Sequence, residues 1–306
     1  MEPIILVHGG AGDVPASKVA LKLSGCKKAV IEGFKLMKNG GTALDAVEAA
    51  VRIMEDEPVF NAGYGSALNI EGEVEMDASV MIGNDLRAGS VSIVKDIAHP
   101  ISLARKVMEK TPHVILSGEG GKKFALEQGF QILDKGALVT EDAKTDLKYG
   151  GHFSELKGNH KKGDVGTVGA VAIDASGMMV AGTSTGGICG KMVGRCSDTS
   201  QIGSGTYANK YGVVSTTGYG EEILKFCLAH TIIKEMENGK SAQEATTKSI
   251  KAMTEQLHKT AGAITLSKGG NIGIDFSSKS MSWAYITKKQ LHYGIEHEQD
   301  EIESLI

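Results

Sequence analysis

The sequence has little proline, few aromatic residues and no surplus of basic side chains. It contains 5 Pro, 7 Phe, 7 Tyr and 1 Trp in 306 residues, and its 33 Lys and Arg are outnumbered by 37 Asp and Glu. Proteins that bind nucleic acid carry excess Lys and Arg to neutralise phosphates. The composition, with a pI near 6.2, therefore argues against a nucleic-acid partner.

Long apolar runs and secretion signals are also missing. The segment 1–8 (MEPIILVH) has no Lys or Arg, and its apolar run is too short for a signal peptide or a membrane-spanning helix. The four cysteines form no CxxC pair, which favours reduced thiols; they are Cys26, Cys189, Cys196 and Cys227. We therefore expect a cytoplasmic protein with no membrane partner.

Motifs of several cofactor-dependent classes are absent. The nine histidines form no HxH or HExxH pattern that would suit zinc, and no GxxxxGK[ST] phosphate loop occurs. The segment 203–208 (GSGTYA) touches the dinucleotide pattern but lacks the helix that should follow it. We therefore expect no organic cofactor and no metal held by side chains.

Glycine, by contrast, is abundant. The chain has 40 glycines, well above the usual share of roughly 7%. Because proline is scarce and no repeat of fixed period occurs, this excess does not indicate a collagen-like or low-complexity chain. It indicates many places where the backbone turns sharply or is closely approached.

Local patterns predict a mixed α+β chain. Apolar periodicity predicts helices over 17–38, 42–57, 221–237 and 241–257 and one that begins at Pro100, and the segment 42–45 (TALD) matches a capping box at the start of the second. Strand-like runs occupy 4–8, 73–82, 90–95, 113–117, 167–174 and 178–182, and four more close the chain. Helices flanking largely antiparallel strands predict a layered α+β architecture with one core.

A polar, basic stretch separates the two halves. Residues 141–166 include EDAKTDLKYGGHFSELKGNHKKG and show little apolar periodicity, which predicts a flexible linker. The linker meets a buried strand at Gly166-Thr167. If that bond is cut, the new α-amine of Thr167, with a pKa of about 7.7–8, can deprotonate its own Oγ. One residue would then be nucleophile and base, whereas the plainer alternative is a strand-initiating threonine.

Three turns rich in hydroxyls and glycine strengthen the catalytic interpretation. They are 183–187 (TSTGG), the region of Arg195 and Asp198, and 215–220 (STTGYG), all within about fifty residues of Thr167.

The chain resembles the isoaspartyl peptidase/L-asparaginase family of N-terminal-nucleophile hydrolases, the plant-type asparaginases, over nearly its whole length. The resemblance rests on HGGAG at 8–12, GGTALDAVEAAV at 40–51, FNAGYGS at 60–66, EMDASVM at 75–81, MEKTPH at 108–113, GTVGAVAID at 166–174, TSTGG at 183–187, KMVGR at 191–195 and STTGYGE at 215–221. It implies a single domain with the four-layer αββα sandwich of that family.

The resemblance also implies a maturation and a mechanism. Autocleavage would split the precursor into chains 1–166 and 167–306 and free Thr167 as the nucleophile. Thr185 would hydrogen-bond and orient Thr167, while Thr217 and the Gly218 amide would form the oxyanion hole. The precursor would form a homodimer, which after cleavage has two α chains (1–166) and two β chains (167–306).

Substrate recognition is implied by the same blocks. Arg195 would grip the substrate α-carboxylate, Asp198 would accept from its α-ammonium, and the backbone of Gly218 and Gly220 would complete the clamp. This arrangement selects L-asparagine and β-aspartyl (isoaspartyl) dipeptides, cleaved through a Thr167 acyl-enzyme.

Supporting roles follow for other positions. Asn61 would bond near the nucleophile, and His8, Gly9 and Gly10 would form the glycine loop coupled to maturation before Gly166. The turn from Glu55 to Ala67 would bind a structural sodium ion through backbone carbonyls.

The chain departs from the family pattern in the site region. Cys196-Ser197 stands where Val-Gly is common, and Ser197 would be strained if that position needs a positive φ. Ser204, Thr206 and Tyr219 also differ, the last two among residues expected to line the site. Two alternatives stay open: an unprocessed, catalytically silent relative that acts as a binding or scaffold protein, and a glycosylasparaginase, which the missing signal peptide disfavours.

Overall fold

The structure is a computed structural model, and it describes residues 2–149, 166–287 and 290–305. Its helices are α1 (Ala16–Lys38), α2 (Ala43–Asp56), α3 (Pro100–Lys110), α4 (Gly118–Glu127), α5 (Glu141–Tyr149), α6 (Gly220–Phe226), α7 (Leu228–Glu237) and α8 (Ala242–Leu257). Its strands are β1 (Ile4–Gly12), β2 (Met76–Ile82), β3 (Ala88–Val94), β4 (Ile115–Ser117), β5 (Val168–Ile173), β6 (Met179–Thr185), β7 (Thr206–Asn209), β8 (Gly212–Gly218), β9 (Ala261–Ser267), β10 (Ile272–Phe276), β11 (Ser280–Thr287), β12 (Gln290–Gly294) and β13 (Glu301–Ser304).

The strands form two sheets in the described residues. The nine-stranded sheet has the order β13-β12-β11-β1-β5-β6-β2-β3-β4, and the four-stranded sheet has the order β10-β9-β8-β7. Within the described residues, neighbouring strands of the two sheets are antiparallel except β3 with β4. At the centre of the large sheet, β5 pairs with β1 so that Gly169 lies opposite His8. The start of β5 is therefore fixed beside Gly9 and Gly10 of β1.

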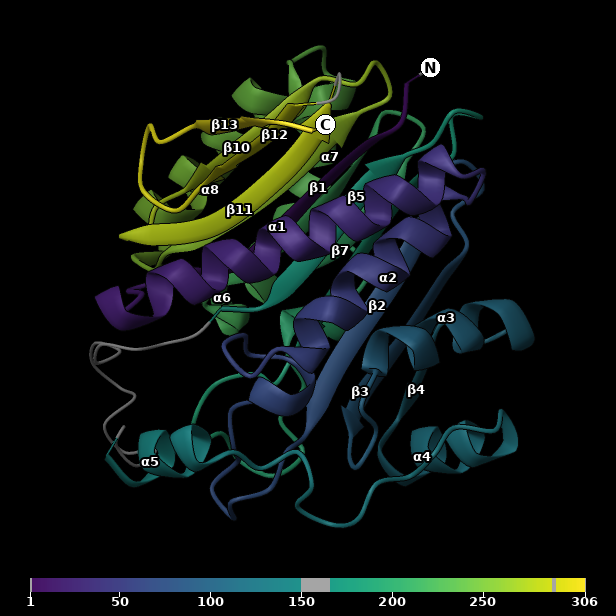
Figure 1. Cartoon of the computed structure of the whole chain (residues 1–306), viewed down its shortest axis with the longest axis vertical. Coiled ribbons are helices and arrows are strands. Elements are labelled where there is room, and N and C mark those ends of the chain that lie inside the picture. Colours follow the sequence, from purple (N-terminus) through teal and green to yellow (C-terminus); the bar gives the residue numbers. More distant parts are fainter. Residues whose placement is uncertain (1, 150–165, 288–289, 306) are drawn as a thin grey trace.

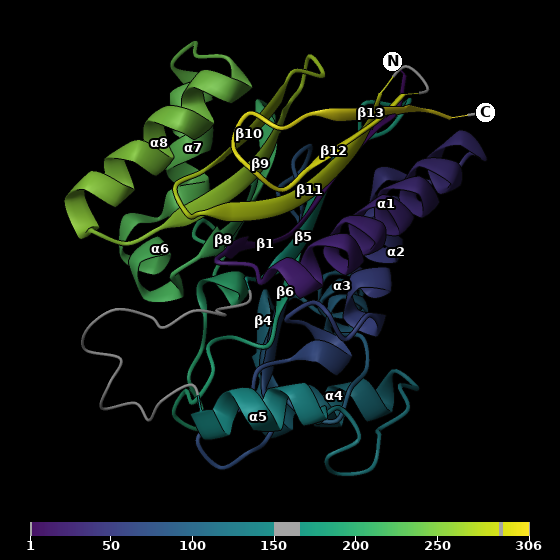
Figure 2. The same ribbon diagram turned by 60° about the vertical axis from the view of Figure 1, so that its left-hand side comes forward.

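Helices cover the outer face of each sheet. Helices α1, α2 and α3 pack on the large sheet, α7 and α8 pack on the small one, and β1, β5 and β6 contact β8 and β9 across the space between the sheets (Figures 1 and 2). Apolar side chains fill that space, among them Leu6, Val171, Ile264, Leu266 and Trp283. The predicted mixed α+β class is confirmed.

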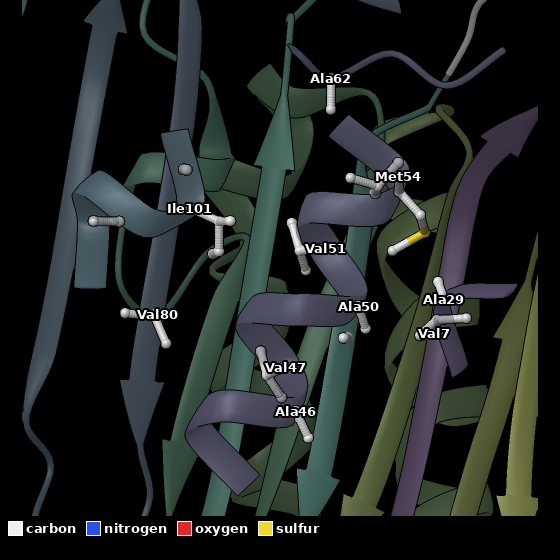
Figure 3. Close-up of a cluster of buried hydrophobic side chains, with 14 of the residues drawn as sticks. Val7, Ala29, Ala46, Val47, Ala50, Val51, Met54, Ala62, Val80 and Ile101 are labelled. Carbon is white, nitrogen blue, oxygen red and sulfur yellow. The ribbon is translucent and has the colours of Figure 1, made fainter. Parts of the chain in front are cut away.

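Helix α2 shows why this packing is close. Its N-terminus carries the predicted capping box, in which Asp45 N donates to Thr42 Oγ1 and Thr42 N donates to Asp45 Oδ2. The face toward the sheet carries small or slender side chains, seen in Figure 3 as Ala46, Val47, Ala50, Val51 and Met54, all wholly buried. Short side chains let the helix axis approach the strands and leave little void.

Several segments differ from the sequence-based expectations, among them the expected turns at 183–187 and 215–220, whose first residues lie in β6 and β8. The helix predicted over 221–237 is broken at Cys227, which has φ +52° and separates α6 from α7. The break is tolerated because the first amides of α7 find partners outside the helix: Ala229 N donates to the Ser204 carbonyl and His230 N to the Gly203 carbonyl. In the expected linker, residues 141–149 form α5, and residues 150–165 lie outside the described residues.

A search of the described residues for a helix that is long and apolar enough to cross a membrane finds no candidate.

Candidate active site

A cavity of about 290 Å³ opens at the ends of β1, β6 and β8, and Thr167, one residue before β5, lies in its wall. The structure brings most of the expected site residues to this cavity: Asn61, Gly166, Thr167, Thr185, Arg195, Asp198, Gly218 and Gly220. Four expected residues, His8, Gly9, Gly10 and Thr217, instead lie just behind the wall.

Thr217 reaches the junction from behind. Its Oγ1 accepts a hydrogen bond from Ala11 N at 3.1 Å, which leaves its own proton free to be donated. A Cβ placed on Gly166 would lie 2.5 Å from that Oγ1, so the hydroxyl sits directly against Gly166. Next along β8, Gly218 has φ +134°, a conformation that favours glycine, and it lines the cavity. The Thr217 hydroxyl therefore lies beside Gly166, and Gly218 lines the same cavity.

The glycines of β1 are packed against the same bond, where the pairing of β1 with β11 shifts register between His8 and Ala11. Gly10 has φ +99°, and a Cβ there would lie 2.4 Å from the Gly166 carbonyl oxygen. This part of β1 is held by Lys22, a buried lysine of α1 whose Nζ donates to the Gly9 carbonyl at 2.7 Å. Burial lowers the pKa of Lys22 to about 8. Gly10 therefore packs closely against one side of the Gly166 peptide.

His8 lies inside the protein, close to Thr167. It is wholly buried, its Nε2 lies 2.8 Å from Ser215 Oγ, and burial lowers its pKa to about 3, although the backbone of Thr167 acts in the opposite direction. It is a neutral imidazole at ordinary pH. A Cβ on Gly169 would meet both the Ser215 Oγ and the His8 Nε2, so a side chain has no room there.

A chain of buried hydroxyls continues from Ser215. Ser215 Oγ lies 2.8 Å from Thr183 Oγ1, which accepts from Thr206 Oγ1 at 2.5 Å. Ser79 Oγ lies within hydrogen-bond distance of both Thr206 Oγ1, at 2.8 Å, and the Thr199 carbonyl, at 2.6 Å. Thr206 is thus fully buried between the sheets and is absent from the cavity wall, which corrects the expectation that it lines the site.

Thr185 lies at the C-terminal end of β6. Its Oγ1 accepts from Gly187 N at 3.0 Å, and within the described residues no hydrogen bond joins it to Thr167. Asn61 holds the segment that follows Thr185 at two points. Its side-chain Nδ2 donates to the Gly187 carbonyl at 2.6 Å, and its main-chain carbonyl accepts from Gly186 N at 2.9 Å. Asn61 therefore positions the backbone next to Thr185.

Ser184, the neighbour of Thr185 in β6, belongs to a GxSxG sequence at 182–186. In a serine nucleophile elbow the serine occupies a sharp turn from strand to helix. Ser184 instead lies inside β6, is buried, and donates to Glu55 Oε1 at 2.6 Å. The geometry does not support a serine nucleophile there.

Arg195 is held by a carboxylate of this chain. Its Nε and Nη2 donate to the two carboxylate oxygens of Glu221 at 2.9 Å each. This two-point pairing fixes the plane of the guanidinium group. Arg195 Nη1 lies on the opposite edge, near Gly187, where a Cβ would come within 3.1 Å. The sequence motif STTGYGE contained Glu221 but gave it no role.

Asp198 is the buried acid of the cavity. Its Oδ2 is buried and has no hydrogen-bond partner among the described residues. Burial raises its pKa to about 7, and the nearby charge of Arg195 opposes that rise. A Cβ on Gly220 would lie 2.7 Å from Asp198 Oδ1 and 2.6 Å from Arg195 Nη2. Glycine at 220 therefore leaves the acid and the guanidinium open to the cavity.

The segment that carries Arg195 and Asp198 is tied to strand β2. Ser197 N donates to Asp77 Oδ2 at 2.6 Å, and Gly194 N donates to Glu75 Oε2 at 3.2 Å. Lys191 is 1% exposed, and its Nζ donates to the carbonyls of Gly186, at 2.8 Å, and Glu75. Burial lowers the pKa of Lys191 to about 8. No local pattern in the sequence distinguishes such a lysine from an exposed one.

The departures at 196 and 197 fit without strain. Ser197 has φ −93° and its side chain accepts from Thr199 N, so it starts the short 3-10 turn at Asp198–Ser200. Its φ is negative, so the position does not need glycine. Cys196 is exposed, and Tyr219 lines the cavity as expected.

The turn at 55–67 gathers carbonyl groups. A Cβ on Gly63 would lie 2.1 Å from the Glu55 carbonyl oxygen, and one on Gly65 would lie 1.9 Å from that of Phe60 and 2.6 Å from that of Pro58. Carbonyl oxygens are the type of ligand that hard cations prefer. A search of the described residues finds no group of three or more His, Cys, Asp or Glu side chains suited to a metal.

Comparison with known proteins agrees with this geometry. The profile of the asparaginase family matches residues 1–295. The chain is 46% identical to a probable isoaspartyl peptidase/L-asparaginase of Drosophila melanogaster, covering 96% of this chain and 95% of that protein. It is 45% identical to the isoaspartyl peptidase/L-asparaginase of Xenopus laevis (100% and 99%) and 45% identical to that of Mus musculus (96% and 90%). The chain therefore belongs to the asparaginase family whose curated members include the isoaspartyl peptidase/L-asparaginases.

Proposed function

We propose that the protein is an amidohydrolase that cleaves its own chain at Gly166-Thr167 and then hydrolyses L-asparagine and β-aspartyl dipeptides. The observation that carries the proposal is one cavity that holds Thr167 together with Arg195 and the unpartnered carboxylate of Asp198. The names of the relatives support the same reaction class.

Maturation would begin with attack of Thr167 Oγ on the Gly166 carbonyl carbon. The hydroxyl proton passes to the Thr167 nitrogen as the peptide C–N bond breaks, which leaves an ester and a free amine. Water then hydrolyses the ester, giving a carboxylate on Gly166 and the free hydroxyl of Thr167. The close approach of Gly10 and Thr217 to Gly166 supports this step, because both pack directly against this residue.

Turnover would use the amine that maturation frees. The Thr167 α-amine, with a reference pKa of about 7.7–8, takes the proton from its own Oγ as that oxygen attacks the substrate side-chain carbonyl. The Thr217 hydroxyl and the Gly218 N–H would stabilise the oxyanion. The α-ammonium returns a proton to the leaving amine, an aspartyl ester forms on Thr167, and water releases L-aspartate.

The α-ammonium and α-carboxylate of the substrate would bind to side chains of opposite charge. The unpartnered Oδ2 of Asp198 would accept from the substrate α-ammonium, and Arg195, oriented by Glu221, would bind the α-carboxylate. The side-chain carbonyl then faces Thr167. A substrate that lacks either of the two α-charges would lose one of these contacts.

The same proposal extends to architecture and ion. The succession of helices, large sheet, small sheet and helices supports the αββα sandwich of N-terminal-nucleophile hydrolases. A sodium ion would be held by the carbonyls of Glu55, Pro58 and Phe60. Bound there, it supplies positive charge that holds the turn carrying Asn61.

Assembly and location rest on the family resemblance. We propose a cytoplasmic homodimer of precursors with two α and two β chains. Light scattering of the purified protein before and after cleavage would measure the assembly directly.

Intact mass spectrometry tests the maturation. The purified chain should convert on incubation to fragments 1–166 and 167–306, and the cleaved protein should release ammonia from L-asparagine and aspartate from a β-aspartyl dipeptide. T167A should abolish both. T167S keeps a hydroxyl and an α-amine and should retain slower cleavage and turnover.

A chain that stays whole for days and never turns over either substrate would refute the proposal and favour a silent binding relative. Equal activity in T167A would refute the role of the nucleophile.

A further inference from the structure

The mouth of the cavity carries two lysines that the proposed mechanism does not use. Lys259 and Lys279 line the same cavity as Thr167 and come from segments other than the one that carries Arg195. Lys259 follows the end of α8, and Lys279 immediately precedes β11. The cavity is therefore basic on a side that the α-head group of the substrate does not occupy.

Lys259 lies beside Tyr219, the residue that follows Gly218 of the proposed oxyanion hole. Its Nζ lies 5.0 Å from the centre of the Tyr219 ring, and the following carbonyl, that of Thr260, accepts from Tyr219 N at 3.2 Å. A cation is attracted to the face of such a ring. Among the described residues, no carboxylate lies within 4.0 Å of the Lys259 amine. Its charge is thus uncompensated in the cavity wall.

Lys279 is placed from the other side. Its Nζ lies 3.2 Å from Asp13 Oδ1, and Ser280 Oγ donates to the Gly12 carbonyl at 3.0 Å, which joins the start of β11 to the end of β1. Ala11, one residue earlier, is the amide that binds Thr217. Lys279 is therefore linked through β1 to the segment beside the reacting bond. Asp13 is its ion-pair partner.

The two proposed substrates differ in the leaving group that would lie beside Lys259 and Lys279. Asparagine releases ammonia, which carries no substituent beyond the scissile bond. A β-aspartyl dipeptide releases an amino acid whose α-carboxylate lies a few bonds from the scissile nitrogen. We propose that Lys259, with Lys279 as the weaker partner, forms a leaving-group subsite that binds the free carboxylate of β-aspartyl dipeptides; this rests on the proposed function.

The size of the effect follows from exposure. Lys259 is half-buried and Lys279 is exposed, so each ion pair with a substrate is screened by water and salt. We expect kcat/KM to be about threefold to tenfold higher for a dipeptide with a free carboxylate than for the same dipeptide as its amide. The preference should fall at high ionic strength.

The experiment compares β-aspartyl-leucine with β-aspartyl-leucinamide, which share the acyl half and the side chain and differ in one charge. Both are assayed with the cleaved full-length protein, its K259Q variant and the K259Q/K279Q double variant. The preference should shrink in K259Q and approach unity in the double variant. D13N, which removes the carboxylate that pairs with Lys279, should enlarge it.

K210Q is the matched control. Lys210 is exposed, and its Nζ lies 5.2 Å from the ring centre of Tyr211, so K210Q removes the same charge and the same kind of ring contact away from the cavity. The wild-type preference should persist in K210Q. Its loss there would assign the effect to net charge and overturn the subsite.

The two proposals fail in different ways. Equal kcat/KM for the acid and the amide, or the same ratio in the wild type and the double variant, overturns the subsite while hydrolysis itself upholds the enzyme. If neither dipeptide nor asparagine is hydrolysed and the chain stays uncut, both proposals are overturned.

Discussion

The Nε2 atom of His8 lies 2.8 Å from the Oγ of Ser215, and both side chains are wholly buried. Through Ser215 and Thr183 this contact joins β1, which pairs with the strand that follows Thr167, to Thr206, which bonds to Ser79. Buried hydroxyls are stabilising only when each finds a partner, since an orphaned one costs free energy. The chain of hydroxyls therefore fixes the spacing of the two sheets directly behind Thr167.

Removing the hydroxyl in the middle of this chain should destabilise the fold. T206A would leave Thr183 and Ser79 each without one partner, and we expect the free energy of unfolding to fall by about 1–3 kcal/mol. Urea denaturation measures this loss. T206S keeps the hydroxyl and should recover most of the stability, so equal losses in both variants would show that the lost methyl group, not the hydrogen bonds, matters.

Local sequence patterns predicted what is local. The capping box at Thr42 and the β1 and β5 strands follow from short-range rules and are present in the structure. The break at Cys227 was missed, because partners from the segment around Gly203 satisfy the amides there. Only tertiary structure brings that segment to the helix.

The candidate site divides in the same way. Thr167, Arg195 and Asp198 could be named because their motifs are distinctive. Lys191 and Glu221 could not, since a buried lysine bound to two carbonyls and a glutamate bound to a guanidinium look like ordinary surface residues in a sequence. Thr206 was expected in the cavity wall from the family resemblance, which gives a position in the chain but not the contacts that bury its side chain between the sheets.

A side chain at Gly10 should block maturation. In G10A the new Cβ would collide with the Gly166 carbonyl, and the backbone at φ +99° would add strain. We expect cleavage at Gly166-Thr167 to slow by more than tenfold, or stop, in a time course of intact mass. Gly40 offers a matched control, because it has φ +90° but open space around its Cβ position. If G40A slows cleavage as much as G10A, strain alone explains the effect.

Removing the charge of Glu221 should weaken substrate binding more than chemistry. In E221Q the guanidinium of Arg195 loses one of its two charge-assisted acceptors, so its orientation toward the substrate carboxylate is less fixed. Because Glu221 is partly exposed, we expect KM for asparagine to rise about threefold to thirtyfold with kcat changed less than twofold. E222Q, one residue further along α6, is the comparison and should leave KM within about twofold. A fall in kcat at unchanged KM would contradict this role.

Asp198 should make stability depend on pH. Burial raises its pKa to about 7 in the folded protein from an ordinary value near 3.8, so between about pH 4 and 7 the folded chain binds a proton that the unfolded chain does not. The contribution of Asp198 to stability is therefore fully present below about pH 4 and is lost as the pH rises through about 7. D198N cannot ionise, so its melting temperature relative to the wild type should rise between pH 5 and pH 8, by an amount equivalent to about 1–4 kcal/mol. Thermal melts of both proteins across that range measure the difference, with D142N, at a carboxylate 75% exposed, as the comparison whose curve should run parallel to the wild type. Parallel curves for D198N as well would show that Asp198 is already ionised in the folded protein at pH 5.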